Sequence, residues 1–370
     1  MQWQRMLENH GVRVSDGNFP QLIFLALQRM EEAHGPHGEV PKTFHTIESH
    51  VLPMMVQALC LAPILDVPLE LLLTVIAWHD AVILFDLPAD SRNPLGMIRR
   101  HRGARSGDQP KGVAGNEAVS AQQMTAAMCK MGGYSHEDMT RSCLAAEVTY
   151  PGVDLGPDFK GAAFESEPLY GALVQQNPVI AELVSLLKKH NIDRGPHFFQ
   201  PHLEEPLKRG EQVDPLALAM GLLDLGTCGL ASPESGAFTR EGNAEYRELH
   251  PNVPAHLERL LLGKTAQDRE DRARVEQDLL AWWLSQPGFA LWQLIRFERI
   301  MGWVGRNRQC NQDQIAQLRH LFRYYRDNVQ LGLASALALQ SSYRGGAYAD
   351  SDFLFTTMGY QVCPVAYQVG

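Results

Sequence analysis

The chain of 370 residues has six cysteines, but no two of them have the C-x-x-C spacing, and most lie in apolar segments. They predict buried thiols, not a disulfide framework or a zinc site. No charge-free run reaches the roughly 20 residues that cross a bilayer. The N-terminus also lacks the basic start and apolar core of a secretory signal. These absences predict a cytoplasmic protein with no membrane partner.

Positive charge is in deficit as well, since the formal net charge is −9. This balance argues against a general electrostatic attachment to nucleic acid polymers or to anionic lipid. Hydrophobic residues at 45% and charged residues at 20% are ordinary for a globular protein. The length permits one large domain or two ordinary ones and leaves a homo-oligomer open.

Strand-like alternation is almost absent until the C-terminal end, whereas most segments have the apolar spacing of helices. We therefore expect an all-α fold, a helical bundle whose side chains meet in one shared centre. Two segments, near 88–115 and 151–210, are expected to be inserted loops, the second with one helix, and both are candidates for lids. From residue 343 onward we expect an extended tail. The predicted helices cover 2–11, 19–33, 42–62, 68–80, 116–131, 135–148, 178–190, 214–228, 253–285, 289–306 and 311–340.

The most informative motif is the pair His79 and Asp80, which ends an apolar run that starts near Pro68. An imidazole and a carboxylate are costly to bury unless something compensates them. A divalent metal ion would compensate both, because each is a ligand for the same class of cation. Taken alone, the pair also fits a helix that simply ends at the surface.

Two further side chains could complete a metal site. His50 lies in a segment with helical apolar spacing, in which Pro53 predicts a kink or a fresh helix start. Asp224 lies in the apolar segment 218–226, where a buried carboxylate needs a partner. Two histidines and two aspartates suit one divalent ion: Mn, Fe, Zn, Co, Ni or Mg.

This arrangement resembles the HD superfamily of metal-dependent phosphohydrolases. The family signature is a histidine, a His-Asp pair on a following helix and a distant aspartate, here at His50, His79, Asp80 and Asp224. The stretches WHDAV at 78–82 and NEAVSA at 116–121 are similar to a bacterial branch with HDAVYD and NEExSA. The segments LDLG at 223–226 and EYR at 245–247 are similar to later motifs of that branch. The resemblance implies an HD-like metal-binding domain at 1–250 and a helical C-terminal extension at 251–370 packed on it.

The chain also departs from the family pattern. Family members often have two histidines four residues apart after a tyrosine, but here Phe44 precedes His45, and His50 follows five residues later. Five residues turn a helix by about 140° past a full turn, so both rings would need a local distortion to face one ion. We assign His50 as the ligand and His45 as a proton donor or a group beside the ligands. No histidine stands at 147–151, where two-metal relatives have one, and this favours a single ion. Leucines occupy 222 and 223, where the branch has Asp-Ala.

The resemblance implies hydrolysis of a small phosphorylated molecule, a nucleotide among the candidates, through a metal-activated water. Asp80 or Asp224 could accept the proton of that water, with His45 and Glu117 as further catalytic candidates. Glu117 equally fits a helix-start residue that follows Asn116 as N-cap. The alternative is a non-catalytic HD-like protein that senses a ligand or has a structural role. Oxygen chemistry at iron, as in some relatives, ranks last, because those sites typically use more histidines.

A basic segment follows the His-Asp pair. Positive charge around phosphate oxygens is what phosphoryl transfer requires. The segment could therefore fold over bound phosphate as a substrate clamp, or it could be an ordinary solvated loop. Its basic residues are Arg99, Arg100, Arg102, Arg105 and Lys111.

Overall fold

The computed structural model describes residues 5, 8–9, 18–34, 43–83, 85–86, 99–100, 115–154, 161–343 and 348–362. The structure is 75% helical and 3% strand, which confirms the predicted all-α class. Most of the expected helix at 2–11 and most of the expected insertion at 88–115 lie outside the described residues.

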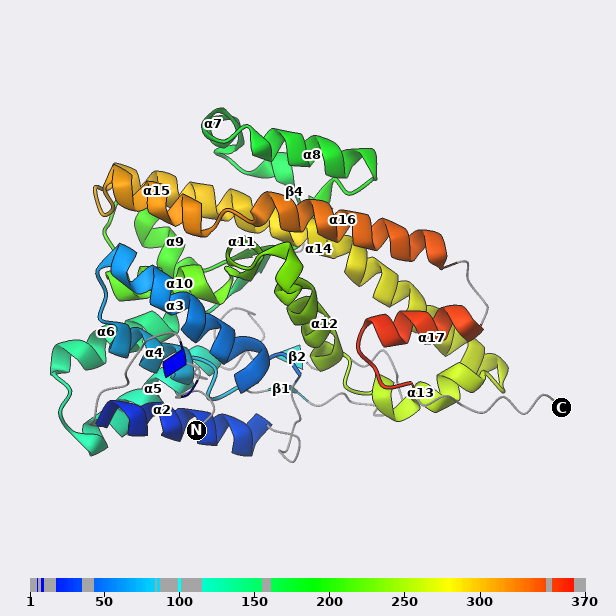
Figure 1. Cartoon of the computed structure of the whole chain (residues 1–370), viewed down its shortest axis with the longest axis horizontal. Helices are drawn as coiled ribbons and strands as arrows, with labels where there is room; N and C mark the ends of the chain where they lie inside the picture. Colours follow the sequence, from blue (N-terminus) through cyan, green and yellow to red (C-terminus); the bar gives the residue numbers. More distant parts are fainter. Residues whose placement is uncertain are drawn as a thin grey trace.

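A bundle of helices from the first two thirds of the chain forms one side of the molecule (Figure 1). Helices α4 (Leu69–Trp78) and α10 (Pro215–Asp224) are apolar on nearly all faces, which favours the centre of a bundle over its surface. Every residue of 71–79 is accordingly buried, and Trp78 Nε1 donates to the carbonyl of Leu22, 3.1 Å away. The bundle consists of α2 (Asn18–His34), a π-helical turn (Ile47–Val51), α3 (Leu52–Leu65), α4 (Leu69–Trp78), α5 (Asn116–Met131), α6 (His136–Glu147) and α10 (Pro215–Asp224).

The segment expected to be an insertion at 151–210 contains more structure than predicted. The expected helix is present as α8 (Val179–Lys189), but α7 (Tyr170–Gln176) and α9 (Pro201–Lys208) were not predicted. Three short antiparallel strand pairs were also missed, because two or three residues are too few for alternation to show. They pair β1 (Phe85–Asp86) with β2 (Arg99–Arg100), β3 (Gly152–Asp154) with β6 (His197–Phe199), and β4 (Ala162–Ala163) with β5 (Arg194–Gly195).

The C-terminal part is built around one long helix, α14 (Ala266–Arg306), which runs across the molecule with α16 beside it (Figure 1). The expected interruption at 286–288 is wrong, because Pro287 lies inside the continuous helix. The break occurs instead at Gly263, whose φ of 53° forms the left-handed end of α13. The other elements are α11 (Thr227–Leu230), α12 (Ala237–Leu249), α13 (Val253–Leu262), α15 (Gln312–Leu321), α16 (Tyr325–Ser342), α17 (Tyr348–Thr357) and the 3-10 turns Phe164–Ser166 and Pro233–Ser235.

The expected extended tail after residue 343 is also wrong over part of its length, since α17 is helical. Phe355 and Met358 are buried there against Trp283 and other residues of α13 and α14, in a second hydrophobic cluster. The main cluster extends from α2 into the second half of α14. The long helix therefore contributes to both cores.

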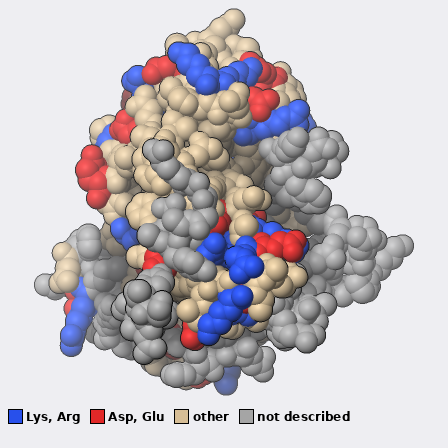
Figure 2. All heavy atoms as spheres, turned by 90° about the vertical axis from the view of Figure 1, so that its right-hand side faces the viewer, with Lys and Arg blue, Asp and Glu red and all other residues tan. Residues whose placement is uncertain are grey.

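By length and composition alone, the described stretch Ile47–Leu65 is apolar enough to cross a membrane. Buried core helices meet the same criterion, and α3 packs against α4, α10 and α15. On the face shown in Figure 2, lysine and arginine side chains are interspersed with aspartate and glutamate over the described atoms.

Strand pair β4–β5 reaches α14 at a point where two glycines meet. A Cβ added at Gly195 would lie 2.6 Å from the carbonyl carbon of Gly288. A Cβ added at Gly161 would lie closer still to the carbonyl carbon of Gly195. Only residues without side chains permit this approach. This close approach packs β5 directly against α14 and so positions one wall of the cavity described below.

We expect Gly195→Ala to lower the free energy of unfolding by about 1–3 kcal/mol, because its methyl group would overlap backbone. Urea denaturation measures this change. Gly171→Ala in α7 is the matched control, since a Cβ there meets nothing within 4 Å, and it should be neutral or slightly stabilising. Equal stability of the two variants would contradict the close packing.

Candidate functional site

His50 enters the site on a π-helical turn. Within this turn, the N–H of Val51 bonds to the carbonyl of Thr46 at 3.3 Å, and the Thr46 hydroxyl accepts from the N–H of Ser49 at 3.1 Å. Such turns widen a helix by one residue and re-aim its side chains. Pro53 follows as the second residue of α3, in the first turn of a helix, where proline is tolerated. The expected distortion near Pro53 is thus present as a π turn, and His50 is 3% exposed.

His79 and Asp80 follow the last residue of α4. The N–H of His79 donates to the carbonyl of Val75 at 2.8 Å and so caps the helix. Its ring Nδ1 lies 2.8 Å from the carbonyl of Ile76 and donates to it. Because a carbonyl only accepts, this bond sets the tautomer and leaves Nε2 free to bind a cation.

Asp224 is the last residue of α10, so two helices and the π turn converge on one point. The Nε2 atoms of His50 and His79 are 3.2 Å apart. Oδ2 of Asp80 lies 3.0 Å from His79 and 3.4 Å from His50, and Oδ1 of Asp224 lies 3.6 and 3.7 Å from them. Ligand atoms about 2.0–2.2 Å from a common transition-metal ion are about 3.0–3.6 Å from their neighbours. The ligand atoms of His50, His79 and Asp224 therefore lie close enough together to share one ion, and Asp80 lies beside both histidines.

The same four groups compensate one another electrostatically. Burial lowers the pKa of His50, but hydrogen bonds to Asp224 and Asp80 outweigh it and raise the value to about 9. Burial raises the pKa of Asp224, but His50 and His79 lower it to about 2. The arrangement thus favours positive charge between two carboxylates. A divalent cation would supply that charge with both imidazoles neutral.

His45 stands beside this cluster, held by Glu248 of α12. Its Nδ1 lies 2.5 Å from Oε1 of Glu248, and its Nε2 is 3.9 Å from Oδ2 of Asp80. Oε2 of Glu248 accepts from the backbone N–H groups of Thr43, Phe44 and His45 at 3.0–3.3 Å. Glu248 therefore fixes both the ring and the bend that carries it. Sequence reasoning missed Glu248, although it follows the EYR segment directly.

Asp224 is held from the other side by Gln200. The Gln200 amide donates to Oδ2 of Asp224 at 2.8 Å and accepts from Arg296 of α14 at 2.6 Å. Arginine only donates and an ionised carboxylate only accepts, so the two charged neighbours determine the orientation of the amide. Gln200 is fully buried. This contact ties the candidate ligand to the C-terminal half of the chain.

The contact continues as a buried ionic network. Arg296 Nε donates to Glu204 at 2.7 Å, Glu204 also accepts from Arg299, and Arg299 bonds Glu167. Burial would raise the pKa of Glu204, but Arg296 and Arg299 hold it below its ordinary value. All four residues are at most 7% exposed. The sequence signal for this network was two arginines within the apolar second half of α14.

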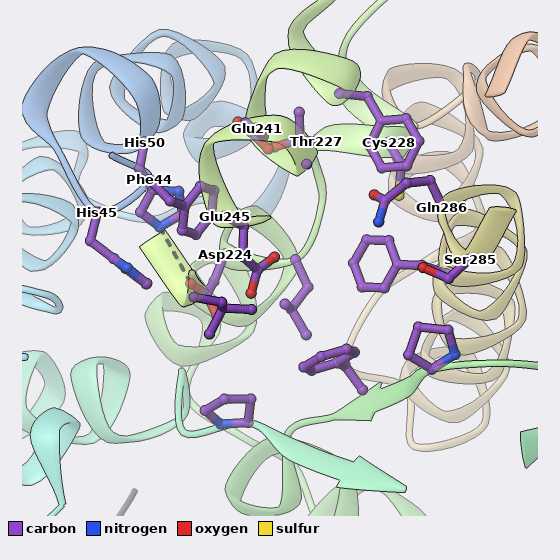
Figure 3. A pocket seen from close by; sticks show the side chains of 18 of the residues that line it. Phe44, His45, His50, Asp224, Thr227, Cys228, Glu241, Glu245, Ser285 and Gln286 are labelled. Carbon is purple, nitrogen blue, oxygen red and sulfur yellow. Dashed lines mark hydrogen bonds and ion pairs between the residues drawn. The ribbon is translucent and has the colours of Figure 1, made fainter. Parts of the chain in front are cut away.

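A cavity of about 480 Å³ adjoins the cluster. Figure 3 shows His45, His50 and Asp224 on one side of it and Ser285 and Gln286 of α14 on the other. Helix α12 lies between them and turns Glu241 and Glu245 toward the open space (Figure 3). The C-terminal extension expected from the sequence therefore forms a wall of this cavity.

The remaining predicted site residues fall in three groups. Glu117 is buried, lines the cavity and is the second residue of α5, so it does lie at a helix start, but the N-cap of that helix is Gly115 and not Asn116. The backbone of Arg99 and Arg100 pairs with Phe85–Asp86, just after the His-Asp pair. The other members of the predicted basic clamp, Arg102, Arg105 and Lys111, lie outside the described residues.

Comparisons of the chain with protein-family models, curated proteins and solved structures found no match in any of the three.

Breaking the buried ionic network should destabilise the fold. We expect Arg296→Met to lower the free energy of unfolding by about 3–5 kcal/mol, because it leaves Glu204 buried without one of its partners. Urea denaturation at neutral pH measures this. Arg274→Met is the matched control, since Arg274 pairs with Glu270 at the surface with 52% of its side chain exposed and should change stability by less than about 1 kcal/mol. Similar losses in both variants would contradict a special role for the network.

Proposed function

We propose that the chain is a metal-dependent phosphohydrolase acting on a small phosphorylated molecule, with one divalent ion held by His50, His79, Asp80 and Asp224. The observation that supports it is the spacing of the ligand atoms, 3.0–3.7 Å from each histidine Nε2 to the other three. An ion at this end of a large cavity would let both buried imidazoles be neutral beside the two carboxylates.

An ion bound there would supply an activated water and polarise a phosphoryl oxygen. Side chains of the protein would then accept and donate the protons. Asp80, which faces both histidines of the cluster, is placed to accept a proton from the attacking water. His45, whose Nδ1 is held by Glu248, presents Nε2 toward the same region and could donate a proton to the leaving alcohol.

The positive charge needed by a phosphate would come from two sources. Arg194 lines the cavity, and the basic segment starts at β2, whose pairing with β1 ties it to the residues after Asp80. We propose that the predicted clamp acts from this position. Its arginines would neutralise the equatorial oxygens of the phosphoryl group.

The first test is metal content, measured by plasma mass spectrometry, together with hydrolysis of 4-nitrophenyl phosphate. We expect roughly one equivalent of a divalent ion per chain, and His79→Ala should lose it, because the variant removes one of the four proposed ligands. Hydrolysis should fall by more than ~100-fold. His320→Ala, which removes an exposed histidine of α15, should keep both. No metal in the wild type after reconstitution would favour the non-catalytic alternative.

A second test addresses the basic segment. Replacing Arg99, Arg100 and Arg102 together with alanine should raise KM for 4-nitrophenyl phosphate by roughly tenfold or more, because charge-assisted bonds to phosphate are lost. The matched control replaces Arg209, Arg274 and Arg326, whose side chains are 49–56% exposed. An unchanged KM in the first variant would identify the segment as an ordinary solvated loop.

A further inference from the structure

The cavity is larger than a phosphate group requires. Its volume of about 480 Å³ falls in the range of sites that enclose a whole organic ligand, which is ~300–1,000 Å³. The cluster of His50, His79, Asp80 and Asp224 occupies one side only, and Ser285 and Gln286 lie across the cavity from it (Figure 3). The part away from the cluster is therefore available to the organic portion of a substrate.

Aromatic rings form much of this lining, and their positions are fixed by contacts with one another and with the backbone. The rings of Phe198 and Phe289 meet edge to face with centroids 5.5 Å apart, and Phe238 stacks on Phe289 at 6.3 Å. Trp282 Nε1 donates to the carbonyl of Gly242 at 3.1 Å, which joins α14 to α12. All four rings line the cavity. Such rings attract apolar groups and, through their faces, cations.

Carboxylates accompany the rings. Glu241 and Glu245 are four residues apart on α12 and so share one face of that helix. Both line the cavity, and Figure 3 shows Glu245 extending into it and Glu241 beside Thr227. Of the described residues that line it, five are acidic and Arg194 is the one lysine or arginine. A divalent ion would compensate Asp80 and Asp224, and the carboxylate of Glu241 would still favour a cationic ligand over a second anion.

Glu241 has the surroundings expected of a recognition group. The Thr227 hydroxyl donates to its Oε1 at 3.1 Å, and within the described chain no lysine or arginine forms an ion pair with it. Burial raises the pKa of Glu241 to about 7, against the opposing influence of His50. A buried carboxylate held by one hydroxyl in an aromatic cavity is completed by a positively charged donor.

We infer that this cavity binds an organic ammonium group, placed between Glu241 and the rings of Trp282, Phe238 and Phe289. This inference rests on the proposed function for its second half: the substrate is then the phosphate ester of an amino alcohol with an apolar body. The phosphate end lies at the histidine–aspartate cluster and the amine end at α12 and α14. Glu241 and Glu245 select the substrate and take no part in the chemical step.

The experiment compares two probes of the same shape by isothermal titration calorimetry, 2-naphthylmethylamine and the neutral 2-naphthalenemethanol. We expect the amine to bind the full-length protein at least ~10-fold more tightly, as a charge-assisted contact predicts. Glu241→Gln, which keeps the shape and removes the charge, should abolish this preference. Glu234→Gln, at an exposed glutamate of the turn Pro233–Ser235, should retain it.

Equal binding of the two probes to the wild-type protein, or an unchanged preference in Glu241→Gln, would overturn the inference. Glu245→Gln provides the same test if Glu241→Gln fails to fold by circular dichroism, and it should at least halve the preference. Titrations with and without added Mn²⁺ distinguish a failure of this inference from a failure of the proposed function. Hydrolysis of 4-nitrophenyl phosphate without amine preference overturns this inference alone, whereas amine preference without hydrolysis overturns the proposed function alone.

Discussion

The architecture depends on burying two imidazole rings and two carboxylates at one point. Each of these groups is costly to remove from water, and the cost is offset because each histidine Nε2 lies 3.0–3.7 Å from the other ring and from both carboxylates. The elements that carry them therefore have to end at the same place. The π turn, the C-terminus of α4 and the C-terminus of α10 do so, and their otherwise apolar faces supply the bundle core.

The buried amide of Gln200 extends this constraint to the rest of the chain. It binds Asp224 on one side and Arg296 on the other, and through Arg296 it reaches Glu204 and Arg299. Helix α14 therefore holds a candidate ligand in place while its other residues, Trp282 among them, form the cavity wall. The C-terminal extension is thus part of the site, and recognition of an organic ligand would depend on it as much as on the cluster.

The local sequence pattern predicted much of the helical bundle and of the cluster. The apolar run before His79 and Asp80 predicted a buried helix that ends in two polar groups, and most long helices were expected close to where they lie. Errors arose where backbone geometry is decided by neighbours. Pro287 predicted a break, but it is buried within α14 and packs against α16, 3.8 Å from a Cβ that Gly332 would carry. Tertiary packing there outweighs the lost hydrogen bond.

The sequence by itself determined the all-α class and the four polar side chains that meet at the centre, because burial of isolated charges in apolar helices leaves few ways to compensate them. Only the tertiary structure decided which groups surround that centre. Glu248, Gln200 and Glu241 come from α12 and from the segment before α9, far from the cluster in sequence. Their roles depend on side-chain contacts between distant segments, and periodicity along one chain carries no information about such contacts.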